Sequence, residues 1–312
     1  MAETSIEWTQ RPGTKGVTWN PSTGCDKISA GCGLPRFPGD DTGGCYAMAM
    51  AKRLKAMGQA KYQNDGDPRT SGPGFGVTMH TDVLPQPLKW RDPRTVFVNS
   101  MSDLGHARIS REFVAQVWAV MAATPQHVYQ ILSKRPERMA RILNDECRCG
   151  SGHAPGVHFR SAMDWASTPH SPTYVPGMQP GLYHRITWPL PNVWVGTSIE
   201  LDKHVDRADA LRATPAAVRF ISAEPLLGPL PSLDLTGIDQ IIIGGESGPG
   251  SRPMDLGWVR ELISMARDAD TAVFVKQLGL RWAGSGKGGD WTAWPEDLRI
   301  REYPADRVAV AS

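Results

Sequence analysis

The chain has 312 residues, 40% of them hydrophobic, and a formal net charge of +2, which suits one large domain or two ordinary ones and neither indicates nor excludes a nucleic-acid partner. No run of about eighteen apolar residues and no secretory signal occurs, so we expect a cytoplasmic protein without a transmembrane helix. In that reducing compartment five cysteines are not a disulfide framework, and clustered thiols are more typical of metal sites or catalytic sites.

Three of the five cysteines, Cys25, Cys32 and Cys45, lie in one segment near the amino end that is rich in Gly and Pro. Loops of this composition wrap readily around metals. The segment leads directly into a predicted helix over 45–58, which is rich in Ala, Met and Lys and has Gly58 as its stop signal.

Seven short apolar runs follow, and each ends in a polar or Gly-containing segment. Helical periodicity lies between several of them, at 109–123 with Ser110 as the N-cap, at 203–214 and at 256–269. This alternation predicts an α/β fold, and the number of strands favours a full or partial (β/α) barrel over a doubly wound sheet. The predicted strands, which are rich in β-branched residues, cover 74–80, 95–103, 127–136, 192–200, 218–226, 238–248 and 271–279.

Residues 144–190 interrupt this alternation with a loop-like segment rich in Gly, Pro, His and aromatic residues. We predict an insertion there, acting as a lid or in substrate binding, within a single barrel-like domain. The insertion also contains Cys147, Cys149, His153 and His158, whose spacing is not a standard zinc pattern; they form either a second metal site or incidental thiols in a flexible lid. The predicted division of the chain is 1–143 and 191–285 for the domain, 144–190 for the insertion and 286–312 for a carboxyl-terminal extension.

Polar and charged residues follow six of the predicted strands. In barrels and open α/β sheets, functional sites form at the carboxyl ends of the strands. Because six strands in series end in such residues, we favour a functional site at these ends over the simpler interpretation that the residues only cap helices or turn the chain. The residues are Asn99, Ser100, Ser102 and Asp103; Lys134 and Arg135; Ser198 and Glu200; Glu224; Glu246 and Ser247; and Lys276 and Gln277.

Three thiolates from one segment suit a [4Fe–4S] cluster whose fourth iron has no protein ligand. That open iron would bind S-adenosylmethionine through its amino and carboxylate groups, and an electron from the cluster would cleave the sulfonium to give a 5′-deoxyadenosyl radical. Three other interpretations stay open: a structural zinc site completed by a histidine such as His80 or His106, a purely structural cluster, and unliganded thiols.

Eight segments, among them TWNPSTGCDKISAGC, CYAMAMAKRLK and IIIGGESGPGSRPM, occur in order from about residue 17 to residue 280. Together they resemble a family of phage and prophage proteins that is described as radical-SAM-like and carries a three-cysteine motif. The resemblance implies a partial (β/α) barrel of the radical-SAM type, with Cys25, Cys32 and Cys45 as the ligands of the cluster.

The spacing of the three cysteines departs from that pattern. Six and twelve residues separate them, more than in most radical-SAM enzymes, and residues 33–44 form an insertion relative to the resembled family. Such a loop can still close, because the entropy of loop closure grows only slowly with length.

If the cluster is present, the strand-end residues would position S-adenosylmethionine and the substrate. Glu246, in a Gly-rich turn, would accept hydrogen bonds from the ribose or the amino group, and Arg135 or Lys134 would pair with the methionine carboxylate. Carboxylates at other strand ends would orient the substrate or transfer protons. The cofactor-binding residues on this interpretation are Ser102, Asp103, Arg135, Gly244, Gly245 and Glu246, and the catalytic residues are Glu200, Glu224 and Lys134.

A modest basic surface follows Cys45. A solvated helix face is the simpler interpretation, but basic residues beside an aromatic ring also hold nucleic acids. With the phage origin of the resembled family, this surface favours DNA or RNA modification or repair, with flavodoxin or ferredoxin as the electron donor. The alternatives are a non-catalytic nucleic-acid-binding protein with a structural zinc or iron–sulfur site, and a zinc enzyme on the same barrel. The surface contains Lys52, Arg53, Lys55, Lys61, Tyr62 and Arg69.

Overall fold

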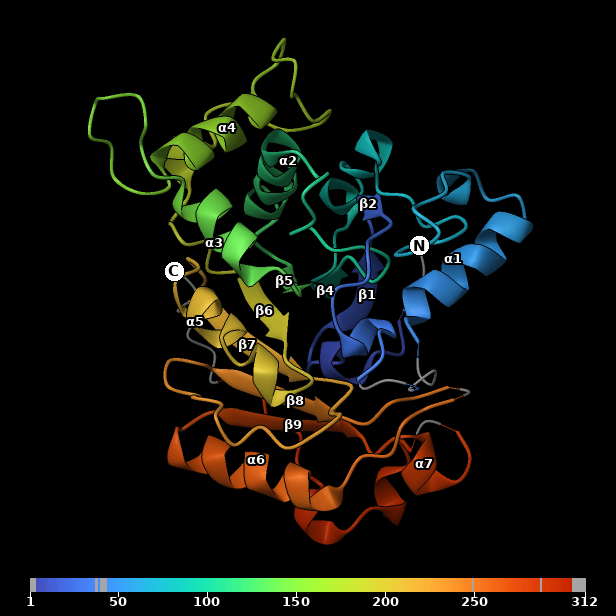
Figure 1. The fold of residues 1–312 in the computed structure, drawn as a ribbon. Helices are drawn as coiled ribbons and strands as arrows, with labels where there is room; N and C mark the ends of the chain where they lie inside the picture. The colour runs from blue at the N-terminus through green and yellow to red at the C-terminus, as the bar shows by residue number, and fades with distance from the viewer. Residues whose placement is uncertain (1–3, 37–38, 40–43, 249, 287, 305–312) are drawn as a thin grey trace.

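The computed structural model has a sheet of seven parallel strands, each paired with the next one along the chain (Figure 1). It describes residues 4–36, 39, 44–248, 250–286 and 288–304. The sheet curls into part of a barrel, and its edge strands β1 and β9 do not pair with each other within the described residues. The sheet therefore agrees with the predicted α/β fold with a full or partial (β/α) barrel, in its partial form. The strands are β1 (Lys15–Trp19), β4 (Arg94–Val98), β5 (Val128–Ser133), β6 (Val193–Ser198), β7 (Val218–Ala223), β8 (Gln240–Gly244) and β9 (Ala272–Gln277).

Six of the seven predicted strands lie in this sheet, and the prediction for residues 74–80 is wrong. That segment contributes only β3 (Thr78–Met79), which pairs antiparallel with β2 (Ser22–Thr23). Gly74 has a φ of +70°, a left-handed conformation that does not fit a strand. The remaining strand of the sheet is β1, whose short sequence KGVTW contains too few apolar residues to indicate a buried strand.

Helices cover the outer face of the curved sheet, and the predicted ones form. Ser110 caps α2 by accepting a hydrogen bond of 3.1 Å from the N–H of Phe113, and Gly58 follows α1 with a φ of +73°. Apolar side chains between the sheet and α2 to α6 make up most of the main core, whereas α1 packs in a separate cluster with Phe75 and Met101. The helices are α1 (Tyr46–Ala56), α2 (Arg111–Ala122), α3 (Pro136–Asn144), α4 (Val157–Ser167), α5 (Arg207–Arg212), α6 (Leu256–Asp268) and α7 (Leu280–Ala283).

The inner face of the sheet carries the alternate residues of each strand, because successive side chains of a strand point to opposite sides. Toward the amino ends these residues form an apolar cluster that is rich in aromatic rings. Trp194 and Phe220 pack there with Trp8, which belongs to the short helix η1 (Glu7–Thr9). The ring of Phe220 fills the space beside Gly196, where a Cβ atom would lie 2.4 Å from it. The amino-terminal segment therefore closes one end of the half-barrel and leaves the carboxyl end to polar residues.

The 144–190 segment is less loop-like than its composition indicates. It contains α4, which packs against α2 in the outer layer (Figure 1), and Phe159 and Met163 of α4 are fully buried in the main core. The apolar residues of this helix are too widely mixed with polar ones to give a clear sequence signal. Within the described residues, no helix combines the length and apolar character needed to cross a membrane.

Candidate functional site

A cavity of about 600 Å³ lies inside the half-barrel, at the carboxyl ends of the strands. Residues of five strands, β1, β4, β5, β7 and β9, form part of its wall, together with residues that follow strand ends, the amino-terminal segment and the cysteine segment. The cavity therefore combines an apolar floor with charged strand ends and exposed backbone. Its lining includes Ile6, Trp8, Thr18, Phe97, Leu132, Ser222, Glu224, Gly245, Glu246, Lys276, Gly31, Gly44 and Tyr46.

The cysteine segment crosses the strand ends and is attached to five of them. Apart from the short helix η2 (Ala30–Cys32), these attachments rather than regular structure fix its course. One hydrogen bond, for example, runs from the N–H of Gly24 to the carbonyl of Met101 over 2.9 Å. The partners of the segment are Met101 after β4, Arg135 after β5, Glu200 after β6, Leu227 after β7 and Arg252 after β8.

The structure brings Cys25, Cys32 and Cys45 into one neighbourhood as free thiols. Cys25 and Cys45 pack against the same apolar cluster, and burial raises the pKa of both thiols, with a smaller rise from Cys32 in each case. Residues 37, 38 and 40–43 of the predicted insertion lie outside the described residues. Its described flanks meet, since a Cβ atom on Gly33 would lie 3.0 Å from Cα of Gly44.

The sulfur of Cys25 faces a cation. Nη1 of Arg135 lies 3.2 Å from this sulfur and 2.8 Å from Oδ2 of Asp103, while Nη2 donates to the carbonyl of Asp26 over 3.0 Å. Burial raises the pKa of Cys25 to about 12, with Asp103 adding to the rise and Arg135 opposing it. The thiol is therefore protonated without a metal, and metal ligation would displace this proton to leave a thiolate beside the guanidinium.

Cys45 is the N-cap residue of α1. Burial raises the pKa of this thiol, and the N–H groups of Met48 and Ala47 oppose the rise without forming a cap hydrogen bond of standard geometry. The amino end of a helix carries a partial positive charge and favours an anionic group. Cys45 therefore lies at the amino terminus of a helix and Cys25 lies beside an arginine, and both surroundings favour a thiolate.

The two histidines considered for a zinc site have other partners. Nε2 of His106 lies 2.9 Å from Oδ2 of Asp26, and Nε2 of His80 lies 2.8 Å from Oγ1 of Thr23. Among the described residues, the three cysteine sulfurs and these histidines do not make a set compact enough for a single ion. A zinc ion holds its ligand atoms within about 4 Å of one another, so these residues would have to move to bind one.

Glu200, predicted to be catalytic, is fully buried and anchors the cysteine segment. Its Oε1 accepts the N–H of Gly31 over 3.2 Å, and its Oε2 lies 3.2 Å from Nη1 of Arg207 and 3.7 Å from Nζ of Lys134. Burial acts to raise the pKa of Glu200, but Lys134, the Ser29 side chain and Arg207 together lower it to about 2. A carboxylate so firmly ionised is a weak proton acceptor near neutral pH, which favours an anchoring role.

Two further glutamates, Glu246 and Glu224, differ in their ion-pair partners and in their exposure. Glu246 is buried, and its oxygens accept hydrogen bonds of 2.6 and 2.8 Å from the guanidinium of Arg252, which also donates to the carbonyl of Ala30. Glu246 is therefore committed to the support of the cysteine segment. Oε1 of Glu224 lies 2.5 Å from Nζ of Lys276, and both side chains stay partly exposed at the cavity wall. This second pair is the more accessible to a ligand.

The remaining residues predicted to bind the cofactor also fall into two groups, those that line the cavity and those that do not. Ser102 and Asp103 are not among the described residues that line the cavity; Oγ of Ser102 lies 2.7 Å from Oγ of Ser22, and Asp103 is buried beside Arg135. Gly245 does line the cavity, and Gly244 lets β8 approach the Glu224 side chain, since a Cβ atom there would lie 3.2 Å from Cγ of Glu224.

Sequence reasoning missed three residues of this site. The ring of Tyr46 stands at the cavity wall with 68% of its surface exposed, and its place next to Cys45 is a signal that was available. Arg207 and Arg252 give no signal in the sequence, because the carboxylates that they bind become their neighbours only in the folded chain.

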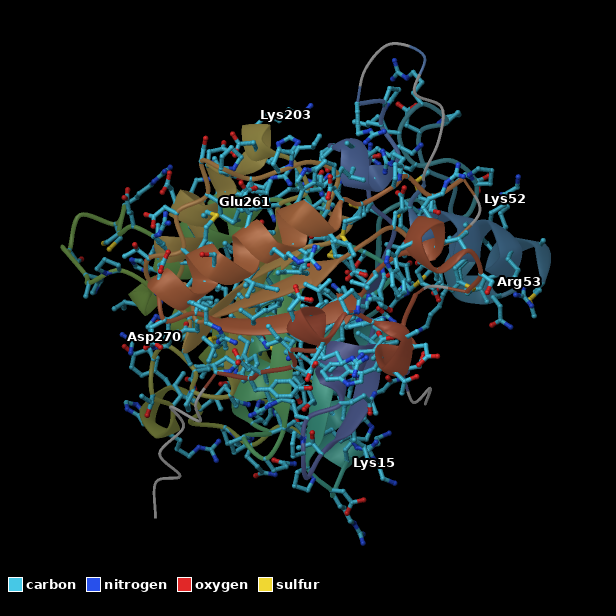
Figure 2. The ribbon with its side chains drawn as sticks, turned by 90° about the horizontal axis from the view of Figure 1, so that it is seen from below. Lys15, Lys52, Arg53, Lys203, Glu261 and Asp270 are labelled. Atoms are coloured by element: carbon cyan, nitrogen blue, oxygen red, sulfur yellow. The ribbon has the colours of Figure 1, made fainter. Side chains whose placement is uncertain are left out.

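The predicted basic surface is smaller than the sequence indicates. Lys52 and Arg53 project from α1 into solvent (Figure 2). Nζ of Lys55 lies 2.5 Å from Asp65, and Nη2 of Arg69 lies 2.7 Å from Asp67. Both ion pairs reduce the positive charge that a polyanion would meet.

A second set of possible metal ligands lies in the 144–190 segment. The ligand atoms of Cys147, Cys149, His153 and His158 all lie within 4.8 Å of one another. These four residues, which the sequence offered as a second site, therefore converge and could hold a metal ion.

Comparison with known proteins shows to which family the chain belongs. Neither the curated proteins nor the solved structures contain a match to the chain. The family model described as "Protein of unknown function (DUF5131)" matches residues 3–292. Because the match covers nearly the whole chain, the protein belongs to the DUF5131 family.

Proposed function

We propose that the protein is a radical-SAM-type enzyme that binds a [4Fe–4S] cluster through Cys25, Cys32 and Cys45 and cleaves S-adenosylmethionine. The observation that carries the proposal is the convergence of three free, partly buried thiols beside a cavity at the carboxyl ends of a curled parallel sheet. Ligands bind at this end in related α/β architectures.

The residues present fit a cluster better than a single ion. The three sulfurs do not belong to a compact single-ion set among the described residues, and thiolates are the usual ligands of iron–sulfur clusters. Arg135 and the amino end of α1 favour thiolates at Cys25 and Cys45. When bound, such a cluster supplies the electron that cleaves the sulfonium to a 5′-deoxyadenosyl radical, after reduction by a donor of the flavodoxin or ferredoxin type.

The chain's own residues would bind and orient the cofactor and keep out water. The Glu224 carboxylate suits the methionine ammonium, and the partly exposed ammonium groups of Lys276 and Lys134 suit the methionine carboxylate. The floor contributed by Trp8 and Phe97 excludes water from the end of the cavity opposite its polar rim.

A nucleic acid is the substrate class that we propose. Tyr46, Arg53 and Met57 are spaced by seven and four residues, so they share one face of α1 and its end, and all three are exposed. This face leads away from the cavity wall at Tyr46. An exposed aromatic ring and a basic side chain on one stripe suit a base and its phosphate.

The proposal is tested by anaerobic reconstitution with iron and sulfide, followed by analysis for iron and for 5′-deoxyadenosine. We expect about four irons per chain and reductive cleavage of S-adenosylmethionine. The Cys32→Ser variant should lose both, and the Cys149→Ser variant should keep both. A colourless protein with one zinc bound at the three cysteines and no cleavage would instead support the non-catalytic nucleic-acid-binding alternative.

A further inference from the structure

We infer that Cys147, Cys149, His153 and His158 form a structural zinc site that is independent of the three-cysteine segment. Sγ of Cys147 lies 3.2 Å from Sγ of Cys149 and 3.5 Å from Nδ1 of His153, and Sγ of Cys149 lies 3.3 Å from the same nitrogen. The edges of a tetrahedral zinc site with sulfur and nitrogen ligands measure roughly 3.3–3.8 Å. The side chains thus stand close to the arrangement that the ion requires.

The loop that carries the ligands has little else to hold it. It joins α3 to α4, and residues 148–155 are all exposed. Its ends are tied together, because the N–H of Gly156 donates to the carbonyl of Asn144. Gly150 and Gly152 have φ values of +83° and +64°, which let the chain turn back between Cys149 and His153. Without apolar burial, a bound metal is the interaction that suits an exposed loop folded back in this way.

His158 supplies the ligand from regular structure. It lies in the first turn of α4, and its ring stands at 90° to the ring of His153, with centroids 5.0 Å apart. Its Nε2 is shielded from solvent and has no hydrogen-bond partner within the part of the chain that the structure describes. A buried polar atom without a partner is costly, and a ligand there would remove that cost.

The donor set selects the metal and its role. Two thiolates and two imidazoles are a typical zinc set, and four protein ligands leave no coordination position open for a substrate. The ion would therefore stabilise the loop rather than act in catalysis. This role needs neither the iron–sulfur cluster nor the proposed activity.

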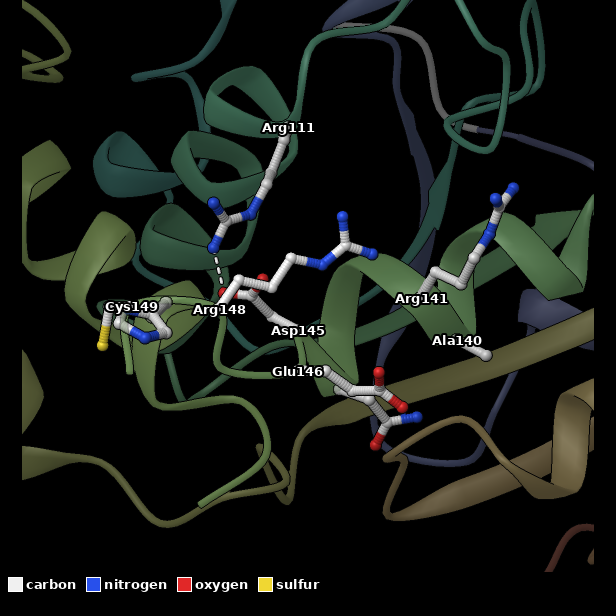
Figure 3. A pocket seen from close by; sticks show the side chains of 9 residues that line it. Arg111, Ala140, Arg141, Asp145, Glu146, Arg148 and Cys149 are labelled. Atoms are coloured by element: carbon white, nitrogen blue, oxygen red, sulfur yellow. Dashed lines mark hydrogen bonds and ion pairs between the residues drawn. The ribbon is translucent and has the colours of Figure 1, made fainter. Parts of the chain in front are cut away.

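The metal would also shape a neighbouring cavity of about 750 Å³ (Figure 3). Cys149 and His158 line this cavity, together with Arg111, Arg141 and Arg148. Arg148 lies between the two thiol ligands in the sequence, and its side chain extends across the cavity in the close view. Zinc would thus fix the main chain on both sides of this arginine.

The experiment is native mass spectrometry and metal analysis of the full chain after purification with zinc, in the Cys25→Ser background to weaken the other thiol site. We expect one zinc per chain, falling below about 0.1 per chain in Cys147→Ser and in His153→Asn. Cobalt substitution of the Cys25→Ser protein should give tetrahedral visible bands with thiolate charge transfer, which supplies a second readout if a variant folds poorly.

Two results would overturn the inference. One is zinc retained in full after both Cys147→Ser and His153→Asn. The other is a reduced protein that takes up no zinc or cobalt and on oxidation loses the mass of two hydrogens as Cys147 and Cys149 pair. Iron content and 5′-deoxyadenosine production by the wild-type protein report separately on the proposed function, so the two ideas can fail independently.

Discussion

The two cysteine regions of this protein differ in their burial and in how compactly their possible ligand atoms are arranged. Cys25, Cys32 and Cys45 are partly buried beside a cavity, with charged residues from several strand ends around them. Cys147 and Cys149 lie in an exposed surface loop with two histidines at single-ion distance. A compact set of four ligands completes the shell of one ion, whereas three thiols gathered beside a cavity, without a fourth ligand at single-ion distance, leave room for a larger group and an external ligand.

The largest effect should come from removing one of the proposed cluster ligands in the first region. We predict that Cys32→Ser lowers bound iron and 5′-deoxyadenosine by more than about 100-fold, because loss of a ligand exceeds the usual effect of losing one of its hydrogen-bond partners. Iron analysis and product chromatography after anaerobic reconstitution measure this. Cys149→Ser is the matched control, and equal iron loss in both variants would remove the distinction between the regions.

The second largest effect should come from Glu200, the buried residue that anchors the cysteine segment. Glu200→Gln removes the charge that faces Arg207 and Lys134, so we expect the free energy of unfolding to fall by about 3 kcal/mol. Urea denaturation gives the value. The exposed pair of Arg260 and Asp297 supplies the control, since Asp297→Asn should cost less than about 0.5 kcal/mol. Similar losses for both would mean that Glu200 is not an anchor.

A smaller effect is expected at Arg135. Lysine cannot reach Cys25, Asp103 and the Asp26 carbonyl at once, so Arg135→Lys should weaken retention of the proposed cluster about 10-fold. Iron release to a chelator over time is the readout. Arg138→Lys is the control, because Arg138 donates to the carbonyl of Ile109 and not to a cysteine. Unchanged release from Arg135→Lys would show that this guanidinium does not support Cys25.

The smallest effect concerns the exposed face of α1. Arg53→Glu should weaken binding of a single-stranded oligonucleotide about 3-fold at moderate salt, because one phosphate contact is replaced by repulsion. Fluorescence anisotropy measures the affinity. Lys15→Glu makes the same charge change at the amino end of β1, away from α1 (Figure 2), and should have no effect. Equal effects would reduce the binding to net charge alone.

Much of the sheet could be predicted because its strands are buried on both faces and therefore read as apolar runs. The run at 74–80 misled because its glycines belong to loops, and β1 was missed because its five residues include Lys, Gly and Thr. Trp8 could not be placed, since it enters the half-barrel only once the strands have curved around it.

The candidate site, like the sheet, could be predicted from the sequence only in part. The three cysteines were visible as a cluster in the sequence, and Lys134 and Glu224 were visible as strand-end residues. The commitment of Glu246 to Arg252 could not be foreseen, because a bidentate ion pair depends on side-chain geometry that a sequence pattern does not encode.

The unpaired edges of the sheet have a consequence for what can enter. Helix η1 contacts both β1 and β9 at the amino end, whereas at the other end Thr18 of β1 and Lys276 of β9 both face the cavity. A complete ring of strands admits only molecules short enough to descend along its axis. In this half-barrel η1 lies against both edge strands and residues 4–8 line the cavity, so a polymer that approached between these edges would meet the amino-terminal segment before its unit reached the cavity.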